Sequence, residues 1–308
     1  MSARPASAGA PAGVHGHARP FAPTWAVLVV SSLLFAVMAV TAKRAAARLP
    51  GPQVAFVRFV IGCLCCGVVA LRLPLRVHNR RGLLLRGALG GSSVLCYFLA
   101  IEHLPIGVAT LLNYTAPVFT AIWATLLLDE RIDVRVLGAL AITTVGVAIV
   151  VKSSGDGSPI GVGAWQLVGM LSAVLSGGAV ATIREVRRTD GSWEIFASFC
   201  LAGAAITALP AWQRWTQPTA VEWLLLTAVG ITSVVGQLLM TYALRFATAT
   251  VVGVIAQLTP VAALALGAAL LGERLPALAF VGAAAALVGV SWGAWIAAQP
   301  QGPLPEES

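Results

Sequence analysis

Two prolines in apolar stretches, Pro117 and Pro260, each follow a hydrogen-bonding residue by three positions, Tyr114 and Gln257. Asn113 lies one residue before Tyr114. Proline removes a backbone donor and clashes with the carbonyl four residues earlier, so it kinks or loosens a helix. Phenol and amide groups at such a break can bind water or a polar solute. We expect Asn113, Tyr114 and Gln257 to line a cavity, with hydrogen bonds that merely join helices as the alternative.

Four further residues could contact a polar solute within apolar stretches. Arg58 is a charge inside such a stretch, so it must be paired, hydrated or extended toward the membrane surface. Lys43 ends the first stretch and is a candidate cavity cation. Tyr97 and Gln237 are weaker candidates, on stretches rich in small residues. Small residues permit close packing or leave room for a ligand, and we expect mainly packing from Gly87, Gly90, Gly91, Ser92, Ser93, Gly230, Ser233 and Gly236.

The chain lacks the residue sets typical of enzymes, metal sites and primary pumps. Two of its four histidines, His15 and His17, lie near the N-terminus, and no P-loop pattern occurs. The five cysteines lie in apolar stretches without metal-ligand spacing, so we expect free thiols. We therefore expect no catalytic residue, no metal and no cofactor. No Asp or Glu lies mid-stretch, which favours facilitated diffusion, exchange or an unorthodox proton path.

The composition indicates that the bilayer is the solvent for most of the chain. Of 308 residues, 58% are apolar and 10% are charged, whereas soluble domains have about 25% charged residues. The net charge of +8 is then typical of cytoplasmic loops that set membrane orientation rather than of nucleic-acid binding. An all-α membrane protein is the fold class that satisfies these constraints.

Ten segments are long enough to cross a bilayer, which takes about 20 residues. Residues 1–23 and 298–308 are expected to be tails, the first of them disordered. The expected transmembrane helices are residues 24–44, 52–72, 83–102, 106–128, 132–151, 162–184, 194–213, 221–244, 248–271 and 276–297.

An internal repeat divides these segments into two sets of five. Five residue types recur at positions 143 residues apart: Ala100 and Ala243, Pro117 and Pro260, Glu130 and Glu273, Arg131 and Arg274, Gly146 and Gly289. An odd number of helices inverts the second copy, which predicts two inverted repeats, 24–151 and 162–297, around a central cavity. We expect structural roles for Pro117, Pro260, Glu130 and Glu273 in this arrangement.

The distribution of Lys and Arg predicts the orientation in the membrane. With the N-terminus inside, 13 positive residues, Arg86 among them, are assigned to the inside and 6 to the outside. Cytoplasmic loops carry the excess of positive residues. The sequence therefore predicts that both termini are cytoplasmic, with Lys43, Arg44 and Arg48 as the residues that oppose the trend.

Residues 25–297 resemble the EamA family of the drug/metabolite transporter superfamily. The resemblance rests on Arg58 in AFVRFVIG, on YTAP and QLTP, and on the helix ends LLLDER and LLGER. It implies ten helices, a central cavity, and proton-linked or bidirectional transport of small metabolites, often amino acids and frequently outward. One departure is that Ser198 stands in the second repeat where the first has Arg58, so any contact with an anion would be one-sided.

These observations together predict a secondary transporter of the bacterial inner membrane. It would export an amino acid or related metabolite by alternating access between its two halves. A channel or facilitator-type pore is the alternative. The expected partners are the solute, the lipid bilayer and a proton or exchanged solute, without nucleic acid, in a monomer or homodimer.

Overall fold

The computed structural model describes residues 23–72, 76–128, 134–154, 163–187, 189–243, 255–256, 258–272 and 276–297. Within these ranges every regular element is a helix. The helices are α1 (Thr24–Ala45), α2 (Gly51–Ala70), α3 (Arg80–His103), α4 (Ile106–Asn113), α5 (Ala116–Leu128), α6 (Val134–Ser154), α7 (Ala164–Val186), α8 (Ser192–Gln213), α9 (Ala220–Ala243), α11 (Leu258–Leu271) and α12 (Ala277–Ala297).

Among the described residues, six helices are long and apolar enough to cross a membrane: α1, α2, α3, residues Ala164–Ile183 of α7, α8 and α9. Large apolar side chains cover much of their outer surface. Leu64 and Val68 on α2, and Leu201 and Leu209 on α8, are each more than 60% exposed. A soluble protein seldom exposes apolar patches of this extent, so the class expected from composition, a helical membrane protein, is confirmed.

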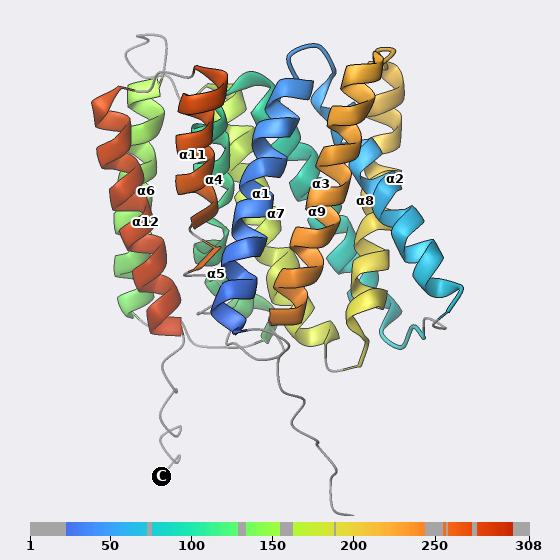
Figure 1. Cartoon of the computed structure of the whole chain (residues 1–308). Coiled ribbons are helices and arrows are strands. Elements are labelled where there is room, and N and C mark those ends of the chain that lie inside the picture. Colours follow the sequence, from blue (N-terminus) through green and yellow to red (C-terminus); the bar gives the residue numbers. More distant parts are fainter. Residues whose placement is uncertain are drawn as a thin grey trace, which may run out of the picture.

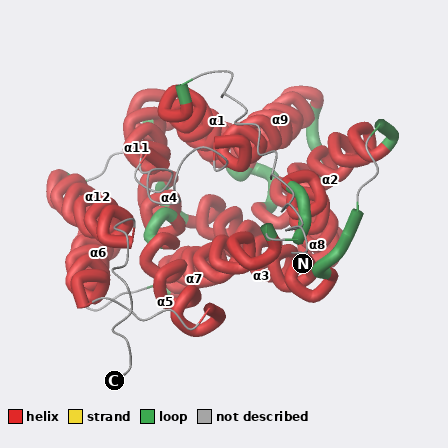
Figure 2. The backbone as a smooth tube through the Cα atoms, turned by 90° about the horizontal axis from the view of Figure 1, so that it is seen from below, coloured by secondary structure: helices red, strands yellow, loops and turns green. Residues whose placement is uncertain are grey.

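The helices form a bundle of two rows between two pairs (Figure 1, Figure 2). Seen along the helices, α11, α1 and α9 form one row, and α5, α7 and α3 form the other (Figure 2). The pair α6 and α12 closes one side of the bundle, and α2 packs on α8 at the opposite side. Helix α1 begins and α12 ends at the same, lower end of the bundle in Figure 1.

Helices α6 and α12 approach each other at glycines on both sides. A Cβ atom placed on Gly146 would lie 2.7 Å from the carbonyl oxygen of Gly282 and still closer to the backbone nitrogen of Ala286. A Cβ on Gly289 would lie 2.7 Å from the backbone nitrogen of Thr143. Real Cβ atoms essentially never come so close to another atom, so this backbone contact requires glycine at both places.

Small residues on the third and eighth expected spans also serve packing, as predicted. A Cβ on Gly87 would lie 2.7 Å from Cβ of Ala202, and one on Gly91 would lie 2.8 Å from Cα of Gly203. On α9, Gly230 lies directly against the side chain of Ile61. These glycines let α3 approach α8, and α9 approach α2.

The segment expected as one helix over 106–128 is two helices separated at Tyr114 and Thr115. Pro117 cannot donate to the carbonyl of Asn113, four residues earlier. The Thr115 hydroxyl donates to the carbonyl of Leu112 over 2.7 Å and helps to close the end of α4. The predicted break is therefore confirmed. In the second repeat α11 begins at Leu258, and residues 248–254 lie outside the described part.

Different polar contacts join segments of the chain at the upper end and at the lower end of the bundle. At the upper end Arg48 pairs with Glu222, and Arg214 Nη2 lies 2.6 Å from Glu102 Oε1. At the lower end the buried carboxylate of Asp190 accepts hydrogen bonds from the backbone N–H of His78, at 2.8 Å, and of Asn79, at 3.0 Å. Both sets connect residues before 105 to residues after 185.

Asp190→Asn is expected to destabilise the protein, and the loss should depend on pH. Burial acts to raise the pKa of this carboxyl, but hydrogen bonds from His78, Thr189 and Asn79 outweigh it and lower the pKa. The stabilisation is therefore present above the unfolded-state pKa, about 4, and is lost as pH falls through the folded-state value. Hydrogen bonds to a charged group contribute about 2 kcal/mol.

Thermal unfolding of both proteins in detergent, at pH 7 and at about pH 3, measures this effect. The melting temperatures should differ at pH 7 and converge in acid. A difference that is the same at both pH values would show that the Asp190 charge contributes nothing.

Candidate functional site

Arg58 lies inside the bundle, where helices of both halves meet. Its side chain extends from α2, is only 6% exposed, and donates from Nε to the hydroxyl of Ser233 on α9. The guanidinium carbon lies 5.3, 5.8 and 5.7 Å from the ring centroids of Phe59, Phe98 and Phe199. The Arg58 side chain is therefore buried among aromatic rings inside the bundle.

Burying this charge has a cost that the rings offset in part. Insertion of an arginine at the centre of a transmembrane helix costs about 2.5–3.5 kcal/mol. A cation over a desolvated aromatic face recovers about 2 kcal/mol or more. Arg58 has no carboxylate partner among the residues that the structure describes. A charge kept here at such a cost is a functional-site candidate.

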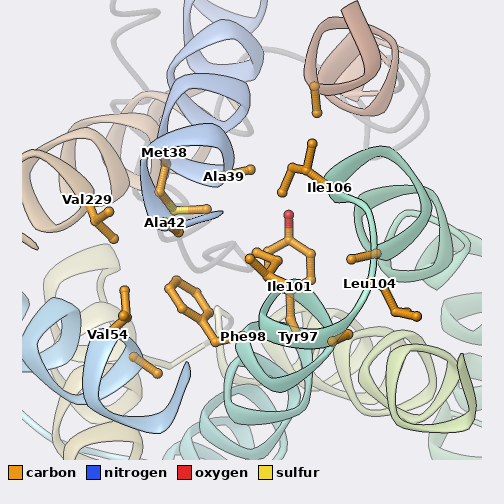
Figure 3. Close-up of a cluster of buried hydrophobic side chains, with 14 of the residues drawn as sticks. Met38, Ala39, Ala42, Val54, Tyr97, Phe98, Ile101, Leu104, Ile106 and Val229 are labelled. Carbon is orange, nitrogen blue, oxygen red and sulfur yellow. The ribbon is translucent and has the colours of Figure 1, made fainter. Parts of the chain in front are cut away.

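Two tyrosines lie close enough to Arg58 to interact with it electrostatically, Tyr97 on α3 and Tyr114 at the break after α4. The Tyr97 hydroxyl lies 3.0 Å from the Thr110 hydroxyl. Figure 3 shows it reaching between α1 and α4, toward Ala39 and Ile106. Tyr114 lies close to the side chain of Thr259 on α11, whose hydroxyl donates to the carbonyl of Ser32. The helix break therefore points a phenol from the first half toward the second.

Asn113 lies on the other side of the break, against α7. Its amide nitrogen donates to the Ser172 hydroxyl over 3.0 Å. The Ser93 hydroxyl donates to the Ser172 carbonyl over 2.8 Å, so α3, α4 and α7 are joined at this point. Asn113 is half-buried, and this contact is the interhelical kind that the sequence left as the alternative to cavity lining.

Lys43 binds the end of α3 near the upper end of the bundle. Its Nζ atom donates to the carbonyls of Ile101 and Leu104, each over 2.8 Å. The last carbonyls of a helix have no partner within it, and a cation there also interacts favourably with the helix dipole. The observed contacts are those of a C-terminal helix cap.

The remaining predicted residues have fewer described contacts. Gln237 is half-buried on α9, and Pro117 and Pro260 lie in the first turn of α5 and of α11. Gln257, Glu130 and Glu273 lie outside the described residues, so their predicted roles stay predictions. The structure thus brings Arg58, Tyr97 and Tyr114 together, whereas Lys43 binds the end of α3.

Arg86 is a buried residue that the sequence analysis missed, because it was counted among the positive residues of the cytoplasmic side. It is 6% exposed within α3, and its guanidinium carbon lies 4.5 Å from the centroid of the Phe199 ring. Without Arg86 the count becomes 12 to 6, so the predicted orientation is unchanged. Its position within the apolar segment 83–102 was the signal that could have revealed it.

Comparison with known proteins gives the family. The sequence model of the EamA-like transporter family matches the chain twice, over residues 23–152 and 163–293. The chain belongs to this family. The expected family is thus confirmed, and the two matches nearly coincide with the predicted repeats.

This EamA-family chain is 34% identical to the pseudopaline exporter CntI of Pseudomonas aeruginosa over 231 residues. The alignment covers 73% of this chain and 80% of that protein. It is 29% identical to solute carrier family 35 member E4 of Homo sapiens, over 75% of this chain and 67% of that protein. One crystal structure aligns with a TM-score of 0.59 at 23% identity, over 89% of this chain and 97% of the other. That likeness supports the fold alone.

These relatives assign the EamA-family chain to a broad class. It is a multi-pass membrane protein whose relatives are transporters rather than enzymes. No described group of His, Cys, Asp and Glu residues could hold a metal ion.

Proposed function

We propose that this protein is a secondary transporter of the bacterial inner membrane that exports a small organic metabolite by alternating access. An amino acid or a related compound is the proposed solute. The proposed fold has ten transmembrane helices in two inverted repeats, with both termini in the cytoplasm. The relative that exports pseudopaline supports outward movement of a metabolite. The alternative is a channel or facilitator-type pore.

The contacts between α6 and α12 are the observation that best supports the inverted repeats. Gly146 approaches Ala286, and Gly289 approaches Thr143. The residues 143 positions after Gly146 and Thr143 are Gly289 and Ala286. The repeat therefore converts the contact of Gly146 with Ala286 into the contact of Gly289 with Thr143. A two-fold axis between equivalent surfaces produces such reciprocal contacts. The packing of the two rows agrees with the repeat. The repeat makes α7 equivalent to α1 and α9 equivalent to α3, and α1 packs on α9 just as α7 packs on α3.

We further propose that Arg58, Tyr97 and Tyr114 contact the solute where the two halves meet. Arg58 donates a hydrogen bond to Ser233, and Tyr114 lies close to Thr259. Separating the halves would break both contacts and free these polar groups for a solute. Asn113, Gln237, Gln257 and Lys43 remain proposed as further substrate-binding residues.

Counterflow in proteoliposomes tests a carrier against a pore. Candidate solutes are first screened by thermal shift of the purified protein, since a bound ligand stabilises it. Liposomes preloaded with an unlabelled hit should then take up the labelled solute faster, and transiently above equilibrium. Uptake that preloading leaves unchanged would instead support the channel or facilitator.

Tyr114→Phe is expected to raise the half-saturation concentration for transport about tenfold, the effect of losing a hydrogen bond worth about 1.4 kcal/mol to the solute. The melting temperature should change little. Thr227→Val on α9 is the matched control, because that exposed hydroxyl bonds only the Trp223 carbonyl of its own helix in the described structure. A lower melting temperature with unchanged half-saturation would indicate that Tyr114 serves packing.

A further inference from the structure

Arg58 and Arg86 lie beside the same aromatic ring. Their guanidinium carbons are 5.7 and 4.5 Å from the centroid of the Phe199 ring. The two groups are also close enough to repel each other electrostatically. The arginines come from α2 and α3 in the first half, whereas Phe199 and Ser233 come from α8 and α9 in the second. The pair therefore lies between the halves.

Arg86 is held in a position that does not satisfy its hydrogen-bonding capacity. Its Nε atom is buried and has no hydrogen-bond partner in the part of the chain that the structure describes. Its Nη1 atom occupies the space above Gly90 that any side chain there would fill. A Cβ on Gly90 would also lie 2.9 Å from the Phe199 ring. Gly90 therefore makes room for the guanidinium group beside that ring.

The two charges have no counter-charge among the described residues. The described carboxylates lie at the ends of helices or in connections, and several have partners there. Glu102 pairs with Arg214, Glu222 pairs with Arg48, and Asp190 accepts backbone hydrogen bonds. Two like charges in a low-dielectric interior without an acid raise the free energy of the bundle. An anion that enters between the halves would lower it.

We propose that Arg58 and Arg86 bind a carboxylate group of the transported solute. This inference rests on the proposed transport function and names the chemical class of the solute. Separation of the halves would withdraw Ser233 and Phe199 from the two guanidinium groups and expose their donors. The repeat supplies no second pair, since Ser198 and Val229 stand where Arg58 and Arg86 stand in the first half. One carboxylate group would therefore bind in one orientation.

A carboxylate fits this pair better than a phosphate does. A guanidinium group binds a carboxylate through two parallel, coplanar hydrogen bonds. The faces of Phe59, Phe98 and Phe199 surround Arg58 and provide no donors. A phosphate dianion has three oxygens that accept hydrogen bonds and therefore needs more donors than a carboxylate does. The aromatic rings cannot supply these donors.

Thermal unfolding of the full-length protein in detergent tests the site. The probes are succinate and citrate, with inorganic phosphate and uncharged succinamide for comparison, at constant ionic strength. At about 10 mM the two carboxylates are expected to raise the melting temperature by about 4 °C, because ligand binding stabilises the folded state. Succinamide should have no effect. Absence of any carboxylate shift, or a shift with phosphate alone, would overturn the proposal.

Variants assign the effect to the arginine pair. Arg86→Gln should abolish the carboxylate shift, whereas Arg81→Gln, which removes an exposed arginine from the same helix, should retain it. Gly90→Ala keeps both charges but displaces the Arg86 guanidinium, so it should also reduce the shift and serves if Arg86→Gln fails to fold. Equal shifts in wild type and either of these two variants would refute the assignment.

Counterflow separates this proposal from the function on which it rests. An Arg86-dependent carboxylate shift without counterflow would refute transport and leave the carboxylate site standing. Counterflow of a solute that has no carboxylate, without any carboxylate shift, would refute the site and leave transport standing.

Discussion

Gly146→Ala is expected to destabilise the protein by about 3 kcal/mol, the upper part of the usual range for overpacking. The new methyl group would overlap the α12 backbone at Ala286 and Gly282. Backbone cannot move aside as the end of a flexible side chain can, so α6 and α12 must separate. The measurement is the melting temperature in detergent together with the yield of folded protein.

Gly67→Ala is the matched control, because a Cβ on this exposed glycine of α2 has no atom within 4 Å. It should stabilise slightly, since alanine favours the helix more than glycine does. Gly289→Ala should resemble Gly146→Ala. The double variant should lose less than the sum of the two effects, because one separation relieves both overlaps. Full additivity would argue against a shared α6–α12 contact.

Lys43→Met is expected to reduce stability by about 2–3 kcal/mol, the range for hydrogen bonds to a charged group. The carbonyls of Ile101 and Leu104 would lose the ammonium group that binds both of them. The end of α3 should then fray, which amide hydrogen exchange of residues 99–105 would detect. Unchanged solute affinity beside this loss of stability would assign Lys43 to the helix cap alone.

Arg44→Met provides the comparison, since the neighbouring exposed arginine makes a single 3.1 Å bond to the Leu270 carbonyl. It should cost markedly less than Lys43→Met. The opposite pattern, with normal stability and a large loss of solute affinity, would support the prediction that Lys43 is a cavity cation.

The helices could be predicted from the sequence because their signals are local. The expected spans 52–72 and 83–102 differ from α2 and α3 by no more than three residues at either end. Glycine and proline mark most of the breaks, and Pro117 locates the gap between α4 and α5 through the backbone donor it lacks. The repeat indicated which helices are equivalent, although not how closely their backbones approach.

The site was only partly predictable because its contacts come from distant parts of the chain. Tyr114 could be selected from its place before a proline. The environment of Arg58 could not, since Phe98 and Phe199 reach it from two other helices. The place of Arg86 within the expected span 83–102 could have shown that it is not a loop residue, but not that it lies beside Phe199 and above Gly90. Burial of a charge is a tertiary property, which hydropathy along the chain does not report.

The polar contacts at the two ends of the bundle differ in the solution conditions that weaken them. Arg48 and Arg214 at the upper end are about half exposed, so dissolved salt can screen their ion pairs. Asp190 at the lower end has a side chain with no exposed surface, so salt has little access to it, and protonation is what removes its charge. The electrolyte on one face of the membrane and the acidity on the other would therefore bias, independently, which end of the bundle separates first.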